Sequence, residues 1–392
     1  MRVLLAFDKC KGSLTAEQMC SLARSSLVSQ SKDFISASVP LTDGGEGFSS
    51  ILTTGADGEH RQFEVRDSLA RTKTVGFGLC QADRLTPKAL EFLGLSGSEK
   101  LAIVEMASVV GLADLKEGER NPWKTTTLGV GDLLREVARL GVEVILLGIG
   151  GSSTNDAGLG ALSSLGLRFL DQDDQRIEVP SPFEWNRVAR IEADELVDLP
   201  PIVIACDVKN QLLGPEGATY QFGPQKGLPE NELADLEGAV IDMLAALEQS
   251  FSGAREMAER PGTGAAGGIG FGLSLQYETK LKPGFSLLDH WFGLEEQIRK
   301  SDLILTGEGR FDRTSMSGKG PFEVIRLAHK HQKNCLVLAG SVEDTAKQEC
   351  ITRFPSCSIE AFGREDLSLE ENFSQASGLF KAKLDSLLAN QE

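Results

Sequence analysis

The sequence lacks any run of about 18 apolar residues, the length that a membrane-spanning helix needs, so no membrane partner is expected. Its opening stretch, Met1–Asp8, meets charge too early for a signal peptide. The seven cysteines include no C-x-x-C pair, which argues against a zinc site and against a disulfide framework. We therefore expect a cytoplasmic protein with reduced thiols.

Histidine and positive charge are also scarce. The four histidines lie away from the glycine-rich loops, so a nucleophilic serine or cysteine would have no paired base, and a histidine-rich metal site is not indicated either. The chain has 40 Lys and Arg against 57 Asp and Glu, a formal net charge of −17. Such acidity argues against a nucleic-acid partner, and an anionic ligand would need a local cluster of cations and backbone amides.

What the sequence does have is length and glycine, with 392 residues and 42 glycines. A chain of this length predicts two domains. Its organising stretch is a buried strand, Val142–Leu147, followed by the glycine-rich loop Gly148–Gly158. A helix is expected to begin near Thr154 or Asn155, and amides at such a loop point at an anion, which predicts a phosphate-binding loop. The plainer alternative is that Asn155 and Asp156 simply cap the helix.

The N-terminal segment has the pattern of a βαβα unit, with strands at Val3–Phe7 and Ile35–Leu41. Polar residues follow both strands: Asp8, Lys11, Asp43 and Glu46. Because ligands of doubly wound folds bind at the carboxyl ends of strands, these are candidate site residues. The alternative for Asp43 and Glu46 is that they cap the next helix.

The middle of the chain changes character. From about residue 59 to residue 80, alternating polar and apolar residues predict antiparallel strands and the entry to a second domain. Further buried strands are expected at 102–106, 202–207, 303–306 and 336–340. The loops around them present Asp207, Lys226, Glu308, Arg310, Asp312 and Lys319. Phosphoryl transfer needs such a set, with cations and amides for the phosphates, carboxylates for magnesium and one carboxylate for the hydroxyl proton.

These residues lie in motifs that resemble those of the class I glycerate kinases, the bacterial glycerate 2-kinase family. In chain order the motifs are Asp8…Lys11, Asp43-Gly44-Gly45-Glu46-Gly47, Gly148-Ile149-Gly150-Gly151-Ser152…Asn155-Asp156, Ala205-Cys206-Asp207-Val208, Phe222-Gly223-Pro224-Gln225-Lys226-Gly227, Ala265-Ala266-Gly267-Gly268, Thr306-Gly307-Glu308-Gly309-Arg310…Asp312 and Gly318-Lys319. The resemblance spans almost the whole chain. It implies phosphorylation of glycerate, with D-glycerate the expected enantiomer, to 2-phosphoglycerate by ATP and Mg2+.

The resemblance also implies a two-domain α/β fold. A flavodoxin-like, Rossmann-like parallel-sheet domain would be built from both chain ends, residues 1–60 and 285–392. Residues 61–284 would form an inserted α/β domain with a mixed sheet, and the active site would lie in the interdomain cleft.

Within this resemblance each candidate has an expected role. Lys11 and Arg310 would hold the glycerate carboxylate or the transferring phosphoryl group, with Lys11 taking part in catalysis. Asp43 and Lys319 would also contact the substrate, Asp43 and Asp207 would bind magnesium, and either Asp156 or Asp312 would be the general base. The nucleotide phosphates would be contacted by Gly148, Gly150, Gly151, Ser152, Ser153, Thr154, Asn155 and Lys226.

The chain departs from the family pattern at Phe7, Lys9, Cys10 and Thr314. These departures bring the identity of the acceptor into question more than phosphoryl transfer itself. Two alternatives therefore stay open: a kinase of the same fold that forms 3-phosphoglycerate or uses another small hydroxy acid, and a non-catalytic nucleotide-binding regulatory protein. The sequence also leaves open whether the chain forms a homo-oligomer.

Overall fold

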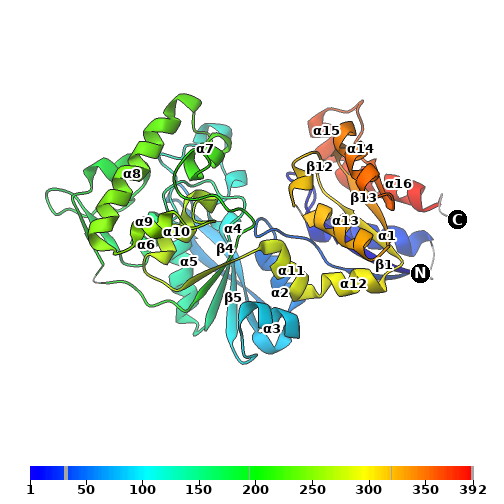
Figure 1. Cartoon of the computed structure of the whole chain (residues 1–392), viewed down its shortest axis with the longest axis horizontal. Helices are drawn as coiled ribbons and strands as arrows, with labels where there is room; N and C mark the ends of the chain where they lie inside the picture. Colours follow the sequence, from blue (N-terminus) through cyan, green and yellow to red (C-terminus); the bar gives the residue numbers. More distant parts are fainter. Residues whose placement is uncertain (31–33, 194, 319, 390–392) are drawn as a thin grey trace. The chain divides into compact units, whose positions relative to one another are not determined.

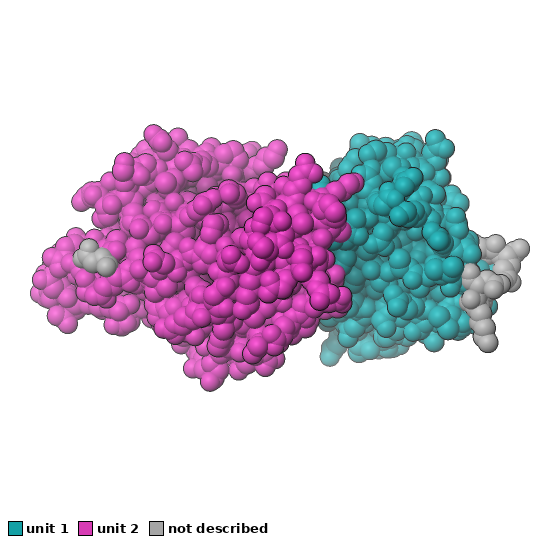
Figure 2. All heavy atoms as spheres, turned by 90° about the horizontal axis from the view of Figure 1, so that it is seen from below, with its two compact units in different colours: residues 1–43, 285–392 teal, residues 44–284 magenta. Residues whose placement is uncertain are grey.

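The computed structural model describes residues 1–30, 34–193, 195–318 and 320–389. The chain divides into two compact units, one of residues 1–43 with 285–392 and one of residues 44–284, teal and magenta in Figure 2. Each unit is an α/β structure with its own main sheet (Figure 1). Within the described residues, no helix is both long and apolar enough to cross a membrane.

The sheet of the first unit is fully parallel and has five strands. Its order across the sheet is β2 (Ile35–Ser38), β1 (Arg2–Phe7), β11 (Leu303–Gly307), β13 (Asn334–Ala339) and β15 (Cys357–Ala361). Counted within this unit, the order is 2-1-3-4-5, which is the flavodoxin-like order. The predicted α/β fold with a flavodoxin-like sheet is confirmed.

Helices cover both faces of this sheet, which explains why its central strands, β1, β11 and β13, are nearly continuous apolar runs. In β1, Val3, Leu5 and Phe7 pack with α1 (Ala16–Gln30) and α16 (Ala376–Ala389). Leu4 and Ala6 point to the other face, whose core includes residues of α12 (Leu294–Lys300), α13 (Gly320–Lys330) and α14 (Asp344–Arg353). Successive side chains of a strand alternate between faces, so a strand covered on both sides must be apolar at every position.

Smaller elements complete the first unit. They are α11 (Gly284–Phe292), β12 (Arg310–Phe311), the 3-10 turn η8 (Ser315–Ser317), β14 (Ser341–Val342) and α15 (Leu369–Ser374). A capping box, which the sequence Thr15-Ala16-Glu17-Gln18 favours, marks the start of α1: the Thr15 N–H donates to Gln18 Oε1 at 2.8 Å, and the Gln18 N–H donates to Thr15 Oγ1 at 3.2 Å.

The sheet of the second unit is mixed and has six strands. Its order is β10 (Thr279–Lys282), β9 (Ile202–Ala205), β6 (Val144–Gly148), β5 (Lys100–Glu105), β4 (Thr72–Gln81) and β3 (Glu59–Arg66). The strands from β10 to β5 pair in parallel, and β4 and β3 add an antiparallel edge, as the alternating pattern of residues 59–80 predicts. Residues 44–60 belong to this unit, because α2 (Phe48–Gly55) packs on β4 and β5.

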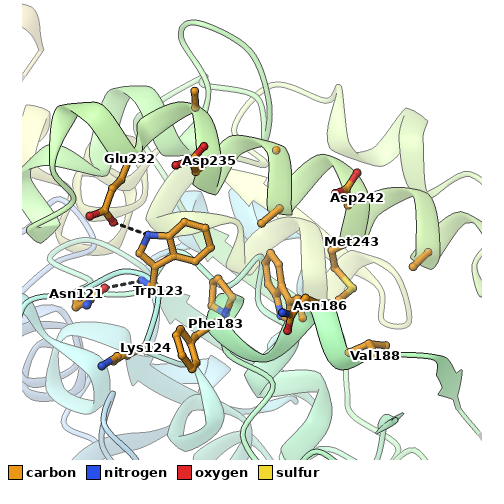
Figure 3. A pocket seen from close by; sticks show the side chains of 16 residues that line it. Asn121, Trp123, Lys124, Phe183, Asn186, Val188, Glu232, Asp235, Asp242 and Met243 are labelled. Atoms are coloured by element: carbon orange, nitrogen blue, oxygen red, sulfur yellow. Dashed lines mark hydrogen bonds between the residues drawn. The ribbon is translucent and has the colours of Figure 1, made fainter. Parts of the chain in front are cut away.

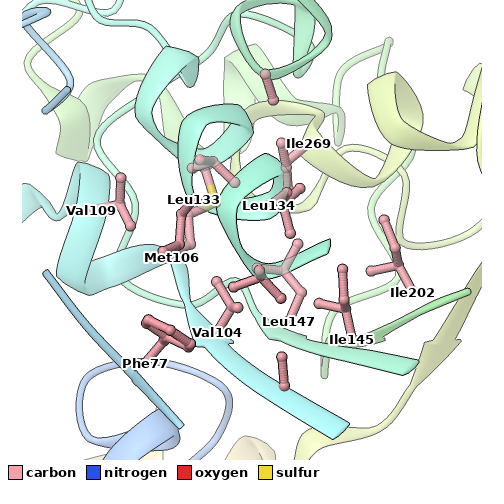
Figure 4. Packing of buried hydrophobic residues seen from close by; sticks show 14 of the residues in the cluster. Phe77, Val104, Met106, Val109, Leu133, Leu134, Ile145, Leu147, Ile202 and Ile269 are labelled. Carbon is pink, nitrogen blue, oxygen red and sulfur yellow. The ribbon is translucent and has the colours of Figure 1, made fainter. Parts of the chain in front are cut away.

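Two hydrophobic cores stabilise the second unit. In the first, shown in Figure 4, Val104, Ile145 and Leu147 of the sheet pack with Leu133 and Leu134 of α5 (Leu128–Arg139). The second core joins α6 (Leu159–Ser164) and α8 (Leu233–Ser250) to the small hairpin of β7 (Arg168–Leu170) and β8 (Arg190–Glu192). The remaining helices are α3 (Pro87–Leu93), α4 (Met106–Val110), α7 (Ala218–Phe222), α9 (Ala254–Ala258) and α10 (Ile269–Ser274).

One predicted boundary is wrong. The helix expected to begin near Thr154 or Asn155 begins only at Leu159, the first residue of α6. Ala157 and Gly158 have left-handed φ values of 52° and 73°, and a helix cannot run through such residues. Residues 149–158 therefore form a long loop.

Candidate active-site residues

The first group of candidates lies at the carboxyl ends of β1 and β11. These strands are neighbours at the point where the strand order of the first unit changes direction, the usual place for a ligand in such sheets. The loops after them also touch. The Asp8 N–H donates to Gly307 O at 2.9 Å, and a Cβ added to Gly309 would lie only 3.2 Å from the Cα of Cys10. Candidates far apart in the sequence are thus neighbours in this unit.

A lysine lies between two carboxylates beside β1. Lys9 Nζ is 3.5 Å from Asp8 Oδ1 and 3.6 Å from Asp43 Oδ1. The side chain of Asp8 is buried, and burial raises its pKa, which the Lys9 cation partly counteracts and the Asp43 charge reinforces. The departure at Lys9 therefore has a physical role in this structure, because it lowers the cost of placing two carboxylates next to each other.

The loop after β11 holds Arg310 and Asp312 together. Arg310 Nε is 3.3 Å from Asp312 Oδ2, and the Arg310 side chain is largely exposed. Asp312 Oδ1 accepts hydrogen bonds from the Thr314 N–H at 2.9 Å and from its hydroxyl at 2.6 Å. The departure at Thr314 thus orients Asp312. One oxygen of the carboxylate is committed to the loop and the other faces the arginine.

Lys11 and Arg310 also share a surface. Both line a cavity of about 480 Å3 in the first unit, together with residues that follow β13 and β15. Lys11 itself sits on the exposed turn after Cys10. The structure therefore brings together the two cations that the sequence predicts as anion contacts.

The glycine-rich loop of the second unit is packed into the protein. The Gly150 N–H donates to Gly44 O, and the Ser153 N–H donates to Val110 O, both at 2.9 Å. A Cβ on Gly148 would lie 2.5 Å from Gly44 O, so glycine is required there for close packing. Residues 152–158 are buried and Gly151 is exposed.

Asp156 has a fully buried side chain inside this loop. Its Oδ2 accepts from the Thr127 N–H at 2.7 Å and from the Thr127 and Thr126 hydroxyls, and its oxygens also accept from the Gly158 and Gly160 N–H groups. Burial raises the pKa of this carboxyl, and the hydrogen bonds oppose that shift. The carboxylate thus satisfies amides at the starts of α5 and α6, a favourable place for negative charge.

Lys226 is buried beside the same loop. Its Nζ donates to Thr154 O at 2.6 Å, and burial lowers its pKa to about 7, with the charge of Asp156 acting against that shift. Next to it, Asn155 Nδ2 donates to Thr219 Oγ1 at 3.3 Å. Within the part of the chain that the structure describes, Thr154 Oγ1 and Asn155 Oδ1 are buried without a hydrogen-bond partner. Lys226 therefore contacts the backbone of the loop and not the side-chain oxygens of Thr154 and Asn155.

The two predicted metal ligands belong to different units. Asp43 belongs to the first unit, and Asp207 is an exposed residue of the second, just beyond β9. Across residues 1–30, 34–193, 195–318 and 320–389, no cluster of three or more His, Cys, Asp or Glu could hold a metal ion alone. Magnesium in kinases usually takes one or two carboxylates and completes its shell with phosphate and water, which fits the pair Asp8 and Asp43 beside Lys9. Lys319 lies outside the described residues.

A second cavity, of about 860 Å3, is lined by none of the predicted residues (Figure 3). It lies in the second unit between α8 and the 3-10 turn η4 (Pro182–Arg187). The Trp123 Nε1–H donates to Glu232 Oε2 at 2.9 Å at one end, and Phe183 lies close to Trp123 in the figure. The chemistry-bearing candidates gather elsewhere.

The sequence did not predict two residues that line the same cavity as Lys11 and Arg310. They are Arg364 and Phe373, which are far from Lys11 and Arg310 in the sequence. A signal for the first of them exists. Gly340 directly follows β13, and Gly363 comes two residues after Ala361, the last residue of β15, and directly precedes Arg364. No comparable signal marks Phe373, which reaches the cavity only through the fold.

Comparisons of the sequence and of the structure with known proteins all find glycerate kinases. A family model described as the glycerate kinase family matches residues 3–388. The chain is 34% identical over 350 residues to a glycerate kinase of Haemophilus influenzae, covering 88% of this chain and 87% of the relative. It is 31% identical over 350 residues to the glycerate 2-kinase of Escherichia coli K12, covering 88% and 86%. A crystal structure of a Salmonella typhimurium LT2 protein, described as a candidate glycerate kinase 2, superposes with a TM-score of 0.76 at 29% identity and covers 100% of this chain and 98% of that one.

Proposed function

Since the chain belongs to the glycerate kinase family, we propose that it transfers the γ-phosphoryl group of ATP to the 2-hydroxyl group of D-glycerate. The product is 2-phosphoglycerate, and Mg2+ accompanies the nucleotide. The observation that carries the proposal is the match of residues 3–388 to one family model, together with relatives named glycerate kinase and glycerate 2-kinase. The buried or half-buried, unpaired state of the seven cysteines supports a cytoplasmic setting for it.

Of the two candidate bases, Asp312 is better suited to take the proton of the substrate hydroxyl. Its Oδ2 lies beside the exposed Arg310, so a substrate anion bound by that arginine would lie close to the carboxylate. Asp156 is fully buried, and both of its oxygens already accept hydrogen bonds from the protein. We assign Asp156 the role of holding the starts of α5 and α6.

Lys11 and Arg310 supply the positive charge that phosphoryl transfer requires. Both are exposed on neighbouring loops of the first unit, where they can contact the glycerate carboxylate or the phosphoryl group in transfer. In a chain with a formal net charge of −17, such a local pair of cations is what makes binding of an anion favourable.

Magnesium fits best at Asp43 and Asp8. Both carboxylates lie within 3.6 Å of the same atom, Lys9 Nζ, so a magnesium ion shared by them would take the place of that ammonium group. The ion would neutralise phosphate charge there when bound. Asp207 stays a second predicted ligand, exposed just after β9.

The glycine-rich loop and Lys226 stay predicted contacts for the nucleotide phosphates. Gly151 is the exposed residue of this loop, so a ligand reaches it without rearrangement of the packing around Gly150 and Ser153. The contact of Lys226 with the loop backbone supports an indirect role, in which the lysine keeps the loop in shape.

The experiment that tests the proposal measures ADP release from MgATP with and without D-glycerate and then adds enolase, which consumes 2-phosphoglycerate directly. Glycerate-dependent ADP and a product consumed by enolase are the expected results. ADP without enolase turnover would move the attack to the 3-hydroxyl group, and no glycerate-dependent ADP would point to another acceptor. ATP binding without any acceptor-dependent release would indicate a regulatory protein.

A further inference from the structure

We propose that the cavity of about 480 Å3 in the first unit binds the adenosine part of the nucleotide, with the phosphates toward Lys11 and Arg310. The identity of the ligand rests on the proposed kinase function. The location is argued from the first unit alone. It differs from the glycine-rich loop of the second unit, which the sequence predicts as the nucleotide contact.

The cavity opens where the fold favours a ligand. Most of its lining comes from the segments that follow β1, β11, β13 and β15, all at the carboxyl edge of one parallel sheet, and α15 and the first residue of α16 supply the rest. It includes residues from both sides of the change in strand order between β1 and β11. Open α/β sheets bind their ligands at this edge and beside this change of order.

Glycines make the floor of the cavity flat. Gly309, Gly340 and Gly363 follow successive strands, and each lies against the backbone of its neighbour. A Cβ would lie 3.2 Å from the Cα of Cys10 at Gly309, 2.5 Å from Gly309 O at Gly340 and 2.3 Å from Gly340 O at Gly363. Side chains are excluded by these contacts, so the floor is backbone that a planar ring can approach closely.

An apolar wall stands next to this floor. Its members are Val342, Phe362, Leu369, Phe373 and Ala376. Phe373 is 42% exposed although it is aromatic, and its ring edge lies 3.2 Å from the position of a Cβ on Gly12. An exposed aromatic ring in a cavity of this size is a natural stacking partner for a planar base.

The wall is preformed by Asn372. Its Oδ1 accepts from the Arg364 N–H at 2.8 Å, and its Nδ2 donates to Arg364 O at 2.9 Å and to Leu367 O at 3.1 Å. These bonds tie the loop after β15 to α15, so binding would not have to order it first.

Three cations are part of the same lining: Lys11, Arg310 and Arg364. The Arg310 and Arg364 side chains are 69% and 58% exposed, and each is paired with a carboxylate, Asp312 and Asp366, so a phosphate would have to compete with these pairs. Glycerate is too small and too polar to use an apolar wall. A ligand that uses the flat floor, the wall and the cations has a planar base and phosphates, and its volume fits a site of several hundred Å3.

The test measures MgATP binding by calorimetry without glycerate, for the unchanged protein and for Phe373→Ala and Arg364→Ala. We expect each variant to raise the Kd for MgATP about tenfold, because one stacking or charged contact is lost. Adenosine alone should lose affinity in Phe373→Ala and keep it in Arg364→Ala. Ser341→Trp, at an exposed position of the lining, is a second test and should also weaken MgATP binding. It fills the cavity without removing a packed side chain.

The matched controls are Val28→Ala and Arg326→Ala, an exposed apolar residue and an arginine paired with Glu323, both outside the lining. Unchanged MgATP binding in Phe373→Ala, Arg364→Ala and Ser341→Trp would overturn the assigned pocket, and normal glycerate-dependent ADP release would then keep the kinase function. Weakened MgATP binding in the variants of a protein that does not phosphorylate glycerate would keep the pocket and overturn the function. No MgATP binding by the unchanged protein would overturn the pocket.

Discussion

Asp156 and Asp312 are the two alternative general bases of the sequence prediction, and their surroundings differ. Asp156 is fully buried among hydrogen-bond donors of α5, α6 and the loop before α6. Asp312 has one oxygen beside the exposed Arg310. A base has to meet the substrate, so the difference in burial separates a structural carboxylate from one that can act in catalysis.

Asp312→Asn tests this assignment through turnover. We expect kcat to fall by about 10²- to 10⁴-fold, since the amide cannot accept the hydroxyl proton, while the KM for glycerate changes little. The control is Asp302→Asn, at the other end of β11, where the carboxylate accepts from the Arg2 N–H. Near-normal turnover in Asp312→Asn would remove Asp312 from the role.

Asp156→Asn should act on stability. The amide presents a donor where the loop and the starts of α5 and α6 also present donors, so we expect the free energy of unfolding to fall by about 2–4 kcal/mol. Urea unfolding at pH 7 measures it, with the exposed Asp242→Asn as the control. An equally stable Asp156→Asn protein that has lost turnover would favour Asp156 as the base.

Lys226 makes a prediction about pH. Burial lowers its pKa to about 7, so between about pH 7 and pH 10 the unfolded chain binds more protons than the folded one. The free energy of unfolding therefore increases as the pH rises through that window, and it decreases again as the pH falls toward 7.

The stability of the unchanged protein relative to Lys226→Met should thus increase from pH 7 to pH 10 in urea unfolding. Lys209→Met, at an exposed position, should show a difference that does not change with pH. If the difference for Lys226→Met were also independent of pH, the pKa of Lys226 would not be lowered in the folded state.

Two helical glycines of the second unit, one in α5 and one in α8, have opposite effects on stability. In α5, a Cβ on Gly129 would lie 1.6 Å from Arg66 O at the end of β3. In α8, a Cβ on Gly238 would meet no atom of the described residues within 4 Å. The first glycine permits the close approach of helix and sheet, and the second only costs backbone entropy.

Alanine at each position should therefore change stability in opposite directions. Gly129→Ala should destabilise the protein by about 1–3 kcal/mol or more, because α5 must move away from the sheet. Gly238→Ala should stabilise it by about 0.5–1 kcal/mol. Thermal unfolding of both variants checks this, and equal shifts in the two would contradict the packing of α5.

The sequence predicts the elements well where their signals are local. The strands β1, β6, β11 and β13 are continuous apolar runs, and the capping box fixes the start of α1. The start of α6 is missed because two left-handed residues, Ala157 and Gly158, interrupt the chain, and the left-handed φ of an alanine has no local signal. The packing of the glycine-rich loop is missed for a similar reason, since its contacts with Gly44 and Val110 are distant in sequence.

In the molecule as a whole, the candidate site residues are divided between the two units. The first unit presents Lys11, Arg310 and Asp312 on loops at the carboxyl edge of its parallel sheet. The second unit holds Asp156 and Lys226 in its interior. Exposed candidates thus occur in both units, because Asp207 and Gly151 of the second unit are exposed as well.

Phosphorus NMR of the product shows directly whether the chain phosphorylates glycerate at its 2-hydroxyl group. The protein would be incubated with MgATP and D-glycerate, and the phosphate ester resonance recorded with proton coupling. Phosphate on the carbon-2 oxygen couples to a single proton, so we expect a doublet that appears only with D-glycerate. A triplet, from the two protons of carbon 3, or no new ester resonance, would mean that the chain does not phosphorylate glycerate at the 2-hydroxyl group.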